Sequence, residues 1–130
     1  MRLYRWLAVV GWMALIFVLS AQPDLPQPAS GWLEWLISSG AHAFVFGVLA
    51  VLLAWALGQR RKALVVAFGL TLVYAFSDEF HQAFVPGRQP DLLDIGCDAL
   101  GAVVGLGLWD WWRRSHGQRE AHRPGPGRAG

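Results

Sequence analysis

The amino-acid sequence predicts an all-α, polytopic membrane protein, a bundle of four transmembrane helices with its N and C termini in the cytoplasm. Of its 130 residues, 55% are hydrophobic and only 15% are charged, whereas a soluble domain usually carries about 25% charged residues. Four apolar stretches approach the roughly 20 residues that a membrane-spanning helix needs. The basic residues fall almost entirely on one side of such a four-span arrangement.

The first predicted span is Tyr4–Ala21. Arg2 and Arg5 precede an apolar run, which resembles a secretory signal peptide. Cleavage after Ala21 would place Leu19 where signal peptides require a small residue, and three further apolar stretches follow. We therefore interpret the first stretch as a retained span, and signal cleavage as the less favoured alternative.

The remaining predicted spans are Ala41–Leu57, which Leu36–Ser39 can extend, Ala63–Phe84 and Leu93–Trp112. Prolines between the first two spans break the helix, and the apolar face of Trp32, Leu33, Trp35 and Leu36 that follows is predicted to lie along the membrane interface. Residues 1–112 thus form one four-helix transmembrane domain. Residues 113–130 are basic and rich in Gly and Pro, so we expect a disordered cytoplasmic tail.

The distribution of Lys and Arg orients the chain. Ten of the eleven lie on the side of the termini, and Arg88 alone lies on the other side. The ten are Arg2, Arg5, Arg60, Arg61, Lys62, Arg113, Arg114, Arg119, Arg123 and Arg128. Because cytoplasmic loops carry an excess of Lys and Arg, both termini are predicted to be cytoplasmic in a multi-pass protein of the cell membrane. The net charge of only +2 and the short basic clusters argue against a nucleic-acid partner.

Polar residues from the four spans are predicted to share one depth. His42 lies 15 residues from Leu57, Asp78 lies 15 from Ala63, and Asp98 lies 14 from Trp112. At about 1.5 Å per residue, all three lie roughly 21–23 Å above the inner boundary of a hydrocarbon core about 30 Å thick. Ser20 in the first span falls near the same level. The sequence therefore predicts a polar layer in the outer third of the bilayer.

Helical spacing places these residues on inward faces. Asp78, His81 and Gln82 follow i, i+3, i+4 spacing on the third span. On the fourth span, one stripe carries Asp91, Asp94, Asp98, Gly101 and Gly105. Its Gly101-x-x-x-Gly105 part lets another helix approach closely. Asp91 follows Pro90 and is predicted to cap the fourth span, with Asp94 at the third helical position. Cys97 lies off the stripe, and a single cysteine excludes an internal disulfide.

The acidic residues of this layer outnumber the fixed cations. Asp78, Glu79, Asp91, Asp94 and Asp98 face Arg88. Confined carboxylates cannot all stay ionised without a positive partner. Either some are protonated, or His42 and His81 are cationic, or a divalent metal ion such as Zn²⁺, Mn²⁺ or Fe²⁺ is bound. The candidate catalytic residues are His42, Asp78, Glu79, His81, Asp94 and Asp98, and the candidate substrate-binding residues are Arg88 and Gln82.

Four segments resemble the VanZ-like family of small bacterial integral membrane proteins. They are Leu-Ser-Ala-Gln-Pro at 19–23, His-Ala-Phe-Val-Phe-Gly at 42–47, Ser-Asp-Glu-Phe-His-Gln-Ala-Phe-Val-Pro-Gly-Arg at 77–88, and Asp94-x-x-x-Asp98-x-x-Gly101-x-x-x-Gly105. The resemblance implies a four-helix envelope protein with a common site. The family is named for a protein linked to resistance to the glycopeptide teicoplanin. Its usual Lys, three residues before the histidine of the second span, is replaced here by Ser39.

Three functions are compatible with this sequence. The first is an enzyme or binding site for a membrane lipid or a lipid-linked anionic envelope substrate, in which Arg88 holds the head group and a carboxylate or histidine serves as general base or metal ligand. The second is a non-catalytic envelope protein that alters antibiotic or lipid access through partner contacts at Trp32 and Trp35. The third is a proton-coupled transporter, which would need a dimer because four spans in a monomer leave little room for alternating access.

Overall fold

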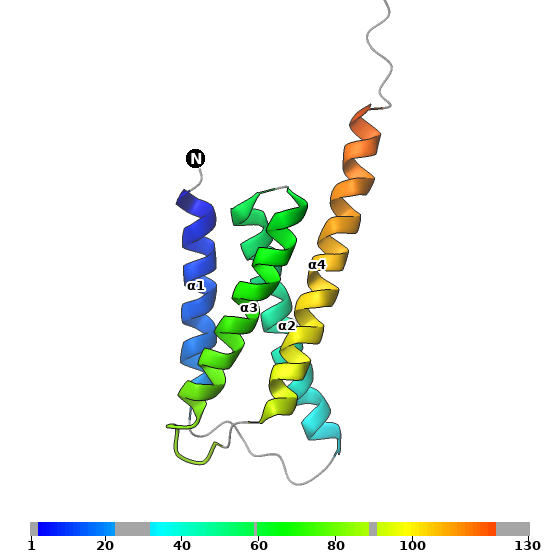
Figure 1. The fold of residues 1–130 in the computed structure, drawn as a ribbon. Coiled ribbons are helices and arrows are strands. Elements are labelled where there is room, and N and C mark those ends of the chain that lie inside the picture. The colour runs from blue at the N-terminus through cyan, green and yellow to red at the C-terminus, as the bar shows by residue number, and fades with distance from the viewer. Residues whose placement is uncertain (1–2, 23–31, 59, 89–90, 122–130) are drawn as a thin grey trace, which may run out of the picture.

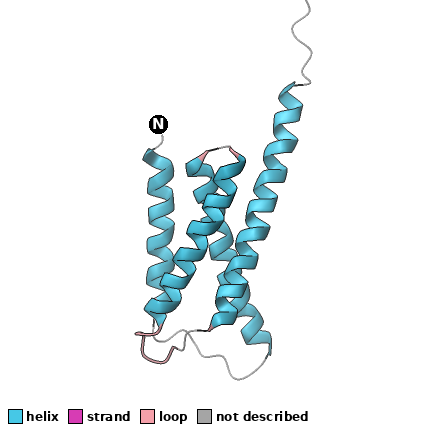
Figure 2. Cartoon of the chain, in the orientation of Figure 1, coloured by secondary structure: helices cyan, strands magenta, loops and turns pink. Residues whose placement is uncertain are grey.

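The computed structural model describes residues 3–22, 32–58, 60–88 and 91–121, and the regular elements of this part of the chain are four helices. They are α1 (Leu3–Ser20), α2 (Trp32–Leu57), α3 (Arg61–Gln82) and α4 (Leu92–Ala121). No strand occurs within these residues (Figure 2). Each helix is long and apolar enough to cross a membrane. The prediction of an all-α, four-span membrane protein is therefore confirmed.

The four helices form an antiparallel bundle in which α2 and α3 lie between α1 and α4 (Figure 1). The starts of α1 and α3 and the ends of α2 and α4 share one end of the bundle, here called the basic end because it carries Arg5, Arg60, Arg61, Arg113 and Arg114. The opposite end, where α1 and α3 finish and α4 begins, is here called the polar end. The first and last described turns of the chain thus lie on the same side.

Helix α2 begins earlier than its predicted span. Trp32 and Trp35, expected in a separate interfacial segment, belong to the first turns of α2. No proline interrupts the sequence between Trp32 and Leu57, and a continuous helix keeps its own backbone groups hydrogen-bonded, as a membrane requires. Pro23, Pro26 and Pro28 lie outside the described residues. The helix ends at Gly58, whose φ of 107° is the left-handed conformation that terminates many helices.

Helix α4 extends beyond its predicted end, to Ala121. The prediction of disorder is therefore wrong for residues 113–121, while residues 122–130 lie outside the described part of the chain. Asp110 accepts hydrogen bonds from Arg113 at 2.9 Å and Arg114 at 2.8 Å, and the Trp112 ring packs on His116. Such i,i+3 and i,i+4 pairs stabilise a helix. The sequence has no proline between Trp112 and Pro124 that would interrupt the helix before Ala121.

Helices α2 and α4 form the most extensive helix contact of the bundle, and glycines make it possible. A Cβ at Gly101 would collide with the backbone of Ala43, and a Cβ at Gly105 would lie 2.7 Å from the carbonyl oxygen of Gly47. A Cβ at Gly47 would in turn lie 2.8 Å from the carbonyl oxygen of Gly101. The prediction that the Gly101–Gly105 stripe admits a close helix is confirmed, and the partner helix is α2.

Helix α1 lies at the edge of the bundle, against α2 and α3. Three side-chain hydrogen bonds to main-chain carbonyls connect it to these helices. Trp12 Nε1 donates to the Val45 carbonyl at 2.9 Å, the Tyr74 hydroxyl donates to Met13 at 2.6 Å, and Arg5 donates to Trp55 at 3.1 Å. Because lipid offers no competing partner, such bonds stabilise helix association in membranes.

Replacing Gly101 by Ala tests the α2–α4 contact. The new methyl group would meet main-chain atoms of Ala43, which cannot move without shifting α2. Overpacking of this kind costs about 1–3 kcal/mol, so we expect Gly101→Ala to lower the thermal unfolding temperature in detergent, measured by circular dichroism. Gly107→Ala is the matched control, because a Cβ at Gly107 meets nothing within 4 Å. Equal melting temperatures for the two variants would contradict this packing.

Candidate functional site

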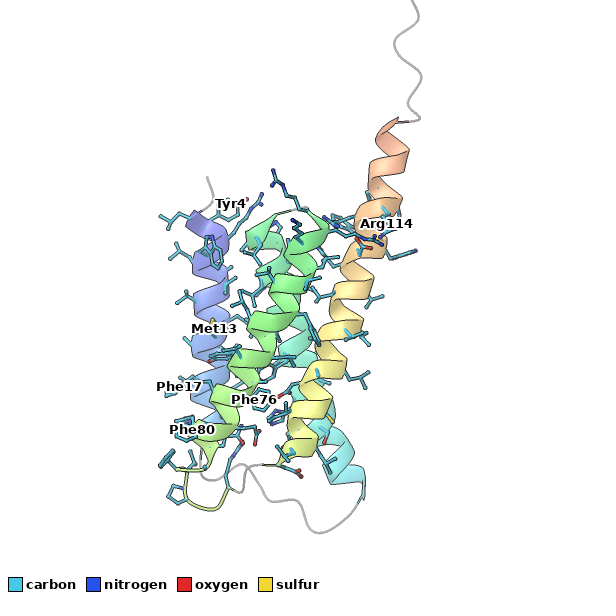
Figure 3. The ribbon with its side chains drawn as sticks, viewed as in Figure 1. Tyr4, Met13, Phe17, Phe76, Phe80 and Arg114 are labelled. Atoms are coloured by element: carbon cyan, nitrogen blue, oxygen red, sulfur yellow. The ribbon has the colours of Figure 1, made fainter. Side chains whose placement is uncertain are left out.

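Polar side chains from the four helices gather at the polar end of the bundle, where Figure 3 shows oxygen and nitrogen atoms between the lower parts of α3 and α4. Phe17, Phe76 and Phe80 lie at the same level beside α1 and α3 (Figure 3). Six polar residues are buried inside the bundle, each less than 7% exposed. They are Ser20, Ser39, Asp78, Glu79, Gln82 and Asp98. We call these six residues, together with His42, Arg88 and Asp94, the polar cluster.

Asp78 is the hydrogen-bonding centre on the α1 side of the cluster. Its Oδ2 accepts a hydrogen bond from the Ser20 hydroxyl of α1 at 2.8 Å and from the Gln82 amide at 2.9 Å. Gln82 lies one turn after Asp78 on α3, so the two side chains share a face as predicted. The sequence predicts Ser20 near this level, and the structure shows that Ser20 is a direct partner of Asp78.

Arg88 extends this network out of α3. Its Nη1 donates to the Gln82 side-chain oxygen at 3.0 Å. A turn after α3 brings Arg88 back beside Gln82. The Arg88 amide donates to the Val85 carbonyl at 3.1 Å, and Gly87 has a φ of 84°, a conformation that residues with side chains rarely adopt. Ser20, Asp78, Gln82 and Arg88 therefore form one continuous hydrogen-bonded chain.

His42 and Asp98 form the second part of the cluster, across the α2–α4 contact. His42 Nδ1 and Asp98 Oδ1 are 3.4 Å apart, within ion-pair distance but without the geometry of a hydrogen bond. The Asp98 side chain is 1% exposed and that of His42 is 15% exposed. The close approach of α2 and α4 at Gly101, one turn from Asp98, places these two side chains together.

Glu79 connects α3 to the start of α4. Its Oε2 accepts a hydrogen bond from the Asp91 amide at 2.9 Å. Asp91 Oδ1 in turn accepts from the Leu93 amide at 2.9 Å, which is the hydrogen bond of an N-cap residue. The prediction that Asp91 caps this helix is confirmed. Glu79 thereby holds the first turn of α4 against the end of α3.

Electrostatic contacts join the two parts of the cluster. Asp98 is close enough to interact with the charges of both Asp94 and Asp78, and His42 with those of Asp94 and Glu79. Asp94 also lies within reach of the Arg88 charge. The structure thus brings His42, Asp78, Asp98 and their neighbours into one site, as the depth argument predicted, while their roles as catalytic or binding groups stay a prediction.

His81 lies on the α1 side of the cluster. Its ring stacks on Phe17 of α1 with centroids 4.2 Å apart. No hydrogen bond or ion pair joins His81 to the acids among the described residues, although it precedes Gln82 directly. The i, i+3 spacing from Asp78 correctly places His81 on α3. It does not predict the stacking on Phe17, because local spacing carries no information on contacts between helices.

Six buried atoms of the site have no hydrogen-bond partner in the described part of the chain. They are Ser39 Oγ, His42 Nδ1, Asp78 Oδ1, Glu79 Oε1, His81 Nδ1 and Asp98 Oδ1. An unpartnered buried polar group costs about 1–3 kcal/mol, so such atoms are rare in folded proteins. Ser39, which stands where the resemblance expects Lys, was not among the predicted site residues. His42 Nδ1 and Asp98 Oδ1 face each other at 3.4 Å, and the other four atoms keep unused hydrogen-bonding capacity.

A preformed metal site is not part of this arrangement. In the ranges that the structure describes, no three His, Cys, Asp or Glu side chains are placed so that they could hold a metal ion. Two hollows, of about 340 and 640 Å³, lie outside the polar cluster and are lined almost entirely by apolar side chains. None of the acidic residues lines either hollow.

The comparison with known families agrees with this geometry. The family model described as VanZ/LLP1 matches residues 5–113, which include most or all of each candidate span and every residue of the polar cluster. The chain belongs to the VanZ-like family. No curated protein and no solved structure matches the chain. This VanZ-like protein is therefore a membrane protein of four apolar helices.

Removing the Asp78 carboxylate tests the hydrogen-bonded chain. Asp78→Ala leaves the Ser20 hydroxyl and the Gln82 amide without their acceptor, so we expect a loss of about 1–3 kcal/mol in the free energy of unfolding. Ser77→Ala, an exposed neighbour on the same helix, is the control and should change stability little. Unfolding in a graded detergent–denaturant series measures both. Equal stability of Asp78→Ala and Ser77→Ala would show that these bonds do not hold α1 in place.

Proposed function

We propose that this VanZ-like protein binds, and acts on, a lipid-linked anionic envelope substrate at the polar cluster. One observation carries the proposal: buried side chains from four helices meet at one end of a membrane bundle and leave carboxylate, imidazole and hydroxyl atoms without partners. Ionisable groups inside a membrane are costly and mark substrate or ion sites by default. A purely structural network would be expected to satisfy its own atoms.

The orientation of the bundle supports an envelope substrate. Among the described residues, Arg88 is the lone Lys or Arg at the polar end, and the other basic residues lie at the basic end. Under the positive-inside rule, the basic end faces the cytoplasm and the polar cluster opens toward the outer leaflet. Lipid-linked intermediates of the envelope present their polar heads at that level.

The chemistry of the cluster suits a head group that carries both phosphate and hydroxyl groups. Arg88 is already placed by Gln82, and a guanidinium can donate two parallel hydrogen bonds to a phosphate. The unpartnered oxygens of Asp78 and Glu79 are acceptors that require hydroxyl or ammonium donors, whereas Asp98 Oδ1 already faces His42 Nδ1. A glycosyl or glycerol phosphate offers both, so its phosphate would lie at Arg88 and its hydroxyls at the acids.

The pairing of His42 and Asp98 supplies a candidate general base. Because Nδ1 faces Asp98, the other ring nitrogen, Nε2, is left for a substrate. A carboxylate beside imidazole orients the ring and stabilises its protonated form, which is the arrangement used by general bases. Asp98 would then act as a positioning residue for His42. The alternative of partner contacts through Trp32 and Trp35 gains no support here, because their side chains lie outside the described part of the chain.

Arg88→Ala tests the proposed anion contact. A hydrogen bond to a charged group is worth about 1.5–3 kcal/mol and 1.4 kcal/mol is tenfold in affinity, so we expect at least roughly tenfold weaker binding of hexadecyl phosphate. Binding is measured on the full chain in detergent by thermophoresis. Uncharged hexadecanol is the reference ligand, and Arg88→Ala should not change its binding. Arg114→Ala, at the basic end, is the matched control.

Asp98→Asn adds a second arm to this experiment, with Asp110→Asn as its control on the same helix. We expect Asp98→Asn to weaken binding, because His42 loses the carboxylate that stabilises its protonated ring, and a protonated ring attracts a phosphate. Asp110→Asn should leave binding unchanged. If folded Arg88→Ala and Asp98→Asn proteins both bind hexadecyl phosphate as the unaltered chain does, the proposed function is wrong.

A further inference from the structure

A long apolar groove runs along the face formed by α2 and α4. It has a volume of about 640 Å³ and is lined by one face of α2, between Ala43 and Leu52, and by one face of α4, between Leu100 and Trp112. Its floor includes Gly47, Gly101 and Gly105, which bring the two helices together and leave no side chains to fill the surface above them. Val48, Val104 and Leu108 are among the walls on either side.

One end of the groove lies next to the polar cluster, although no residue of the cluster lines it. Ala43, which lines it, follows His42 directly, and Gly101 lies three residues after Asp98 on the same helix. From Leu100 to Trp112, 12 residues at about 1.5 Å each give the groove a length of roughly 18 Å. This exceeds half of a hydrocarbon core about 30 Å thick, so the groove passes from the level of His42 and Asp98 toward the basic end.

We propose that this groove holds one hydrocarbon chain of the lipid whose polar head occupies the His42–Asp98 part of the cluster. The inference rests on the proposed function and adds the placement of the substrate's tail. The groove is lined almost entirely by apolar side chains over its length, as a hydrocarbon chain requires. The groove also starts beside the ion pair of His42 and Asp98, which joins α2 to α4.

A transmembrane helix fits this groove less well than a chain does. Helices in membranes associate through small residues that let backbones meet. Here the glycines of the floor are already in contact across α2 and α4, so they are not available to a second copy of the chain. A flexible chain needs neither a wide groove nor a free glycine face.

Two neighbouring valines provide a matched test. Val104 lines the groove and is 53% exposed, whereas Val103 does not line it and is 56% exposed. Val104→Trp should fill the groove, and Val103→Trp should add the same bulk to the lipid-facing surface outside it. Val51→Trp, from the α2 wall, repeats the test from the opposite side in case Val104→Trp fails to fold.

The probe is hexadecyl phosphate with a photoreactive diazirine near the end of its chain, added to the full chain in phosphatidylcholine nanodiscs. We expect crosslinks to residues 43–52 and 100–112, at least fivefold fewer in Val104→Trp and Val51→Trp, and within twofold of the unaltered chain in Val103→Trp. Excess unlabelled hexadecyl phosphate should abolish these crosslinks, whereas butyl phosphate, which lacks the chain, should compete poorly.

The outcomes separate this inference from the proposed function. If Asp98→Asn weakens hexadecyl phosphate binding but both groove-filling variants crosslink normally, the head site stands and the groove inference is wrong. If the groove-filling variants lose crosslinks but Asp98→Asn does not, the groove holds bulk lipid unconnected to the cluster, which overturns both the link proposed here and the head site. Loss of crosslinks in all three variants, with Val103→Trp unaffected, supports the inference.

Discussion

The structure depends on the contact between α2 and α4, in which the backbones of the two helices touch through Gly47, Gly101 and Gly105. Helices in a bilayer gain nothing by hiding apolar surface from water, so close packing of small residues is a main source of their association. This one contact has two consequences. It brings His42 and Asp98 within 3.4 Å of each other at the polar end, and it leaves the adjoining surface hollow.

The polar cluster is maintained at a cost that the remainder of the bundle must offset. Each ionisable residue placed in a membrane costs about 2.5–3.5 kcal/mol on insertion scales. Part of this cost is recovered by specific bonds: Ser20 to Asp78, Arg88 to Gln82, and the Asp91 amide to Glu79. These bonds also connect α1, α3 and the first turn of α4. The same residues therefore position the helices and leave acceptors unpaired, which is the combination expected of a binding site rather than of a structural network alone.

Sequence patterns predicted the features that follow from length, hydropathy and helical periodicity. Four spans, the depth shared by His42, Asp78 and Asp98, the Asp91 cap and the close approach at Gly101 all depend on rise and rotation per residue, which the chain encodes locally. The partners across helices could not be predicted in this way. Stacking of His81 on Phe17 and the buried, unpartnered hydroxyl of Ser39 depend on how helices rotate against each other. The helical extension to Ala121 was missed because the basic composition of the tail outweighed the Asp110–Arg113 and Asp110–Arg114 pairs.

The arrangement of groove and cluster explains why an acidic site could serve an anionic lipid. A headgroup phosphate alone would be repelled by Asp78, Glu79, Asp94 and Asp98, which outnumber Arg88. A lipid held by its chain between α2 and α4 would be brought to the cluster by hydrophobic packing instead of by charge. The head would then lie beside His42 in a fixed direction, with hydroxyls toward the unpaired carboxylates and phosphate toward Arg88. On this view the glycines that join α2 to α4 also set the selectivity of the site, because the groove they create orients the tail before any polar contact forms.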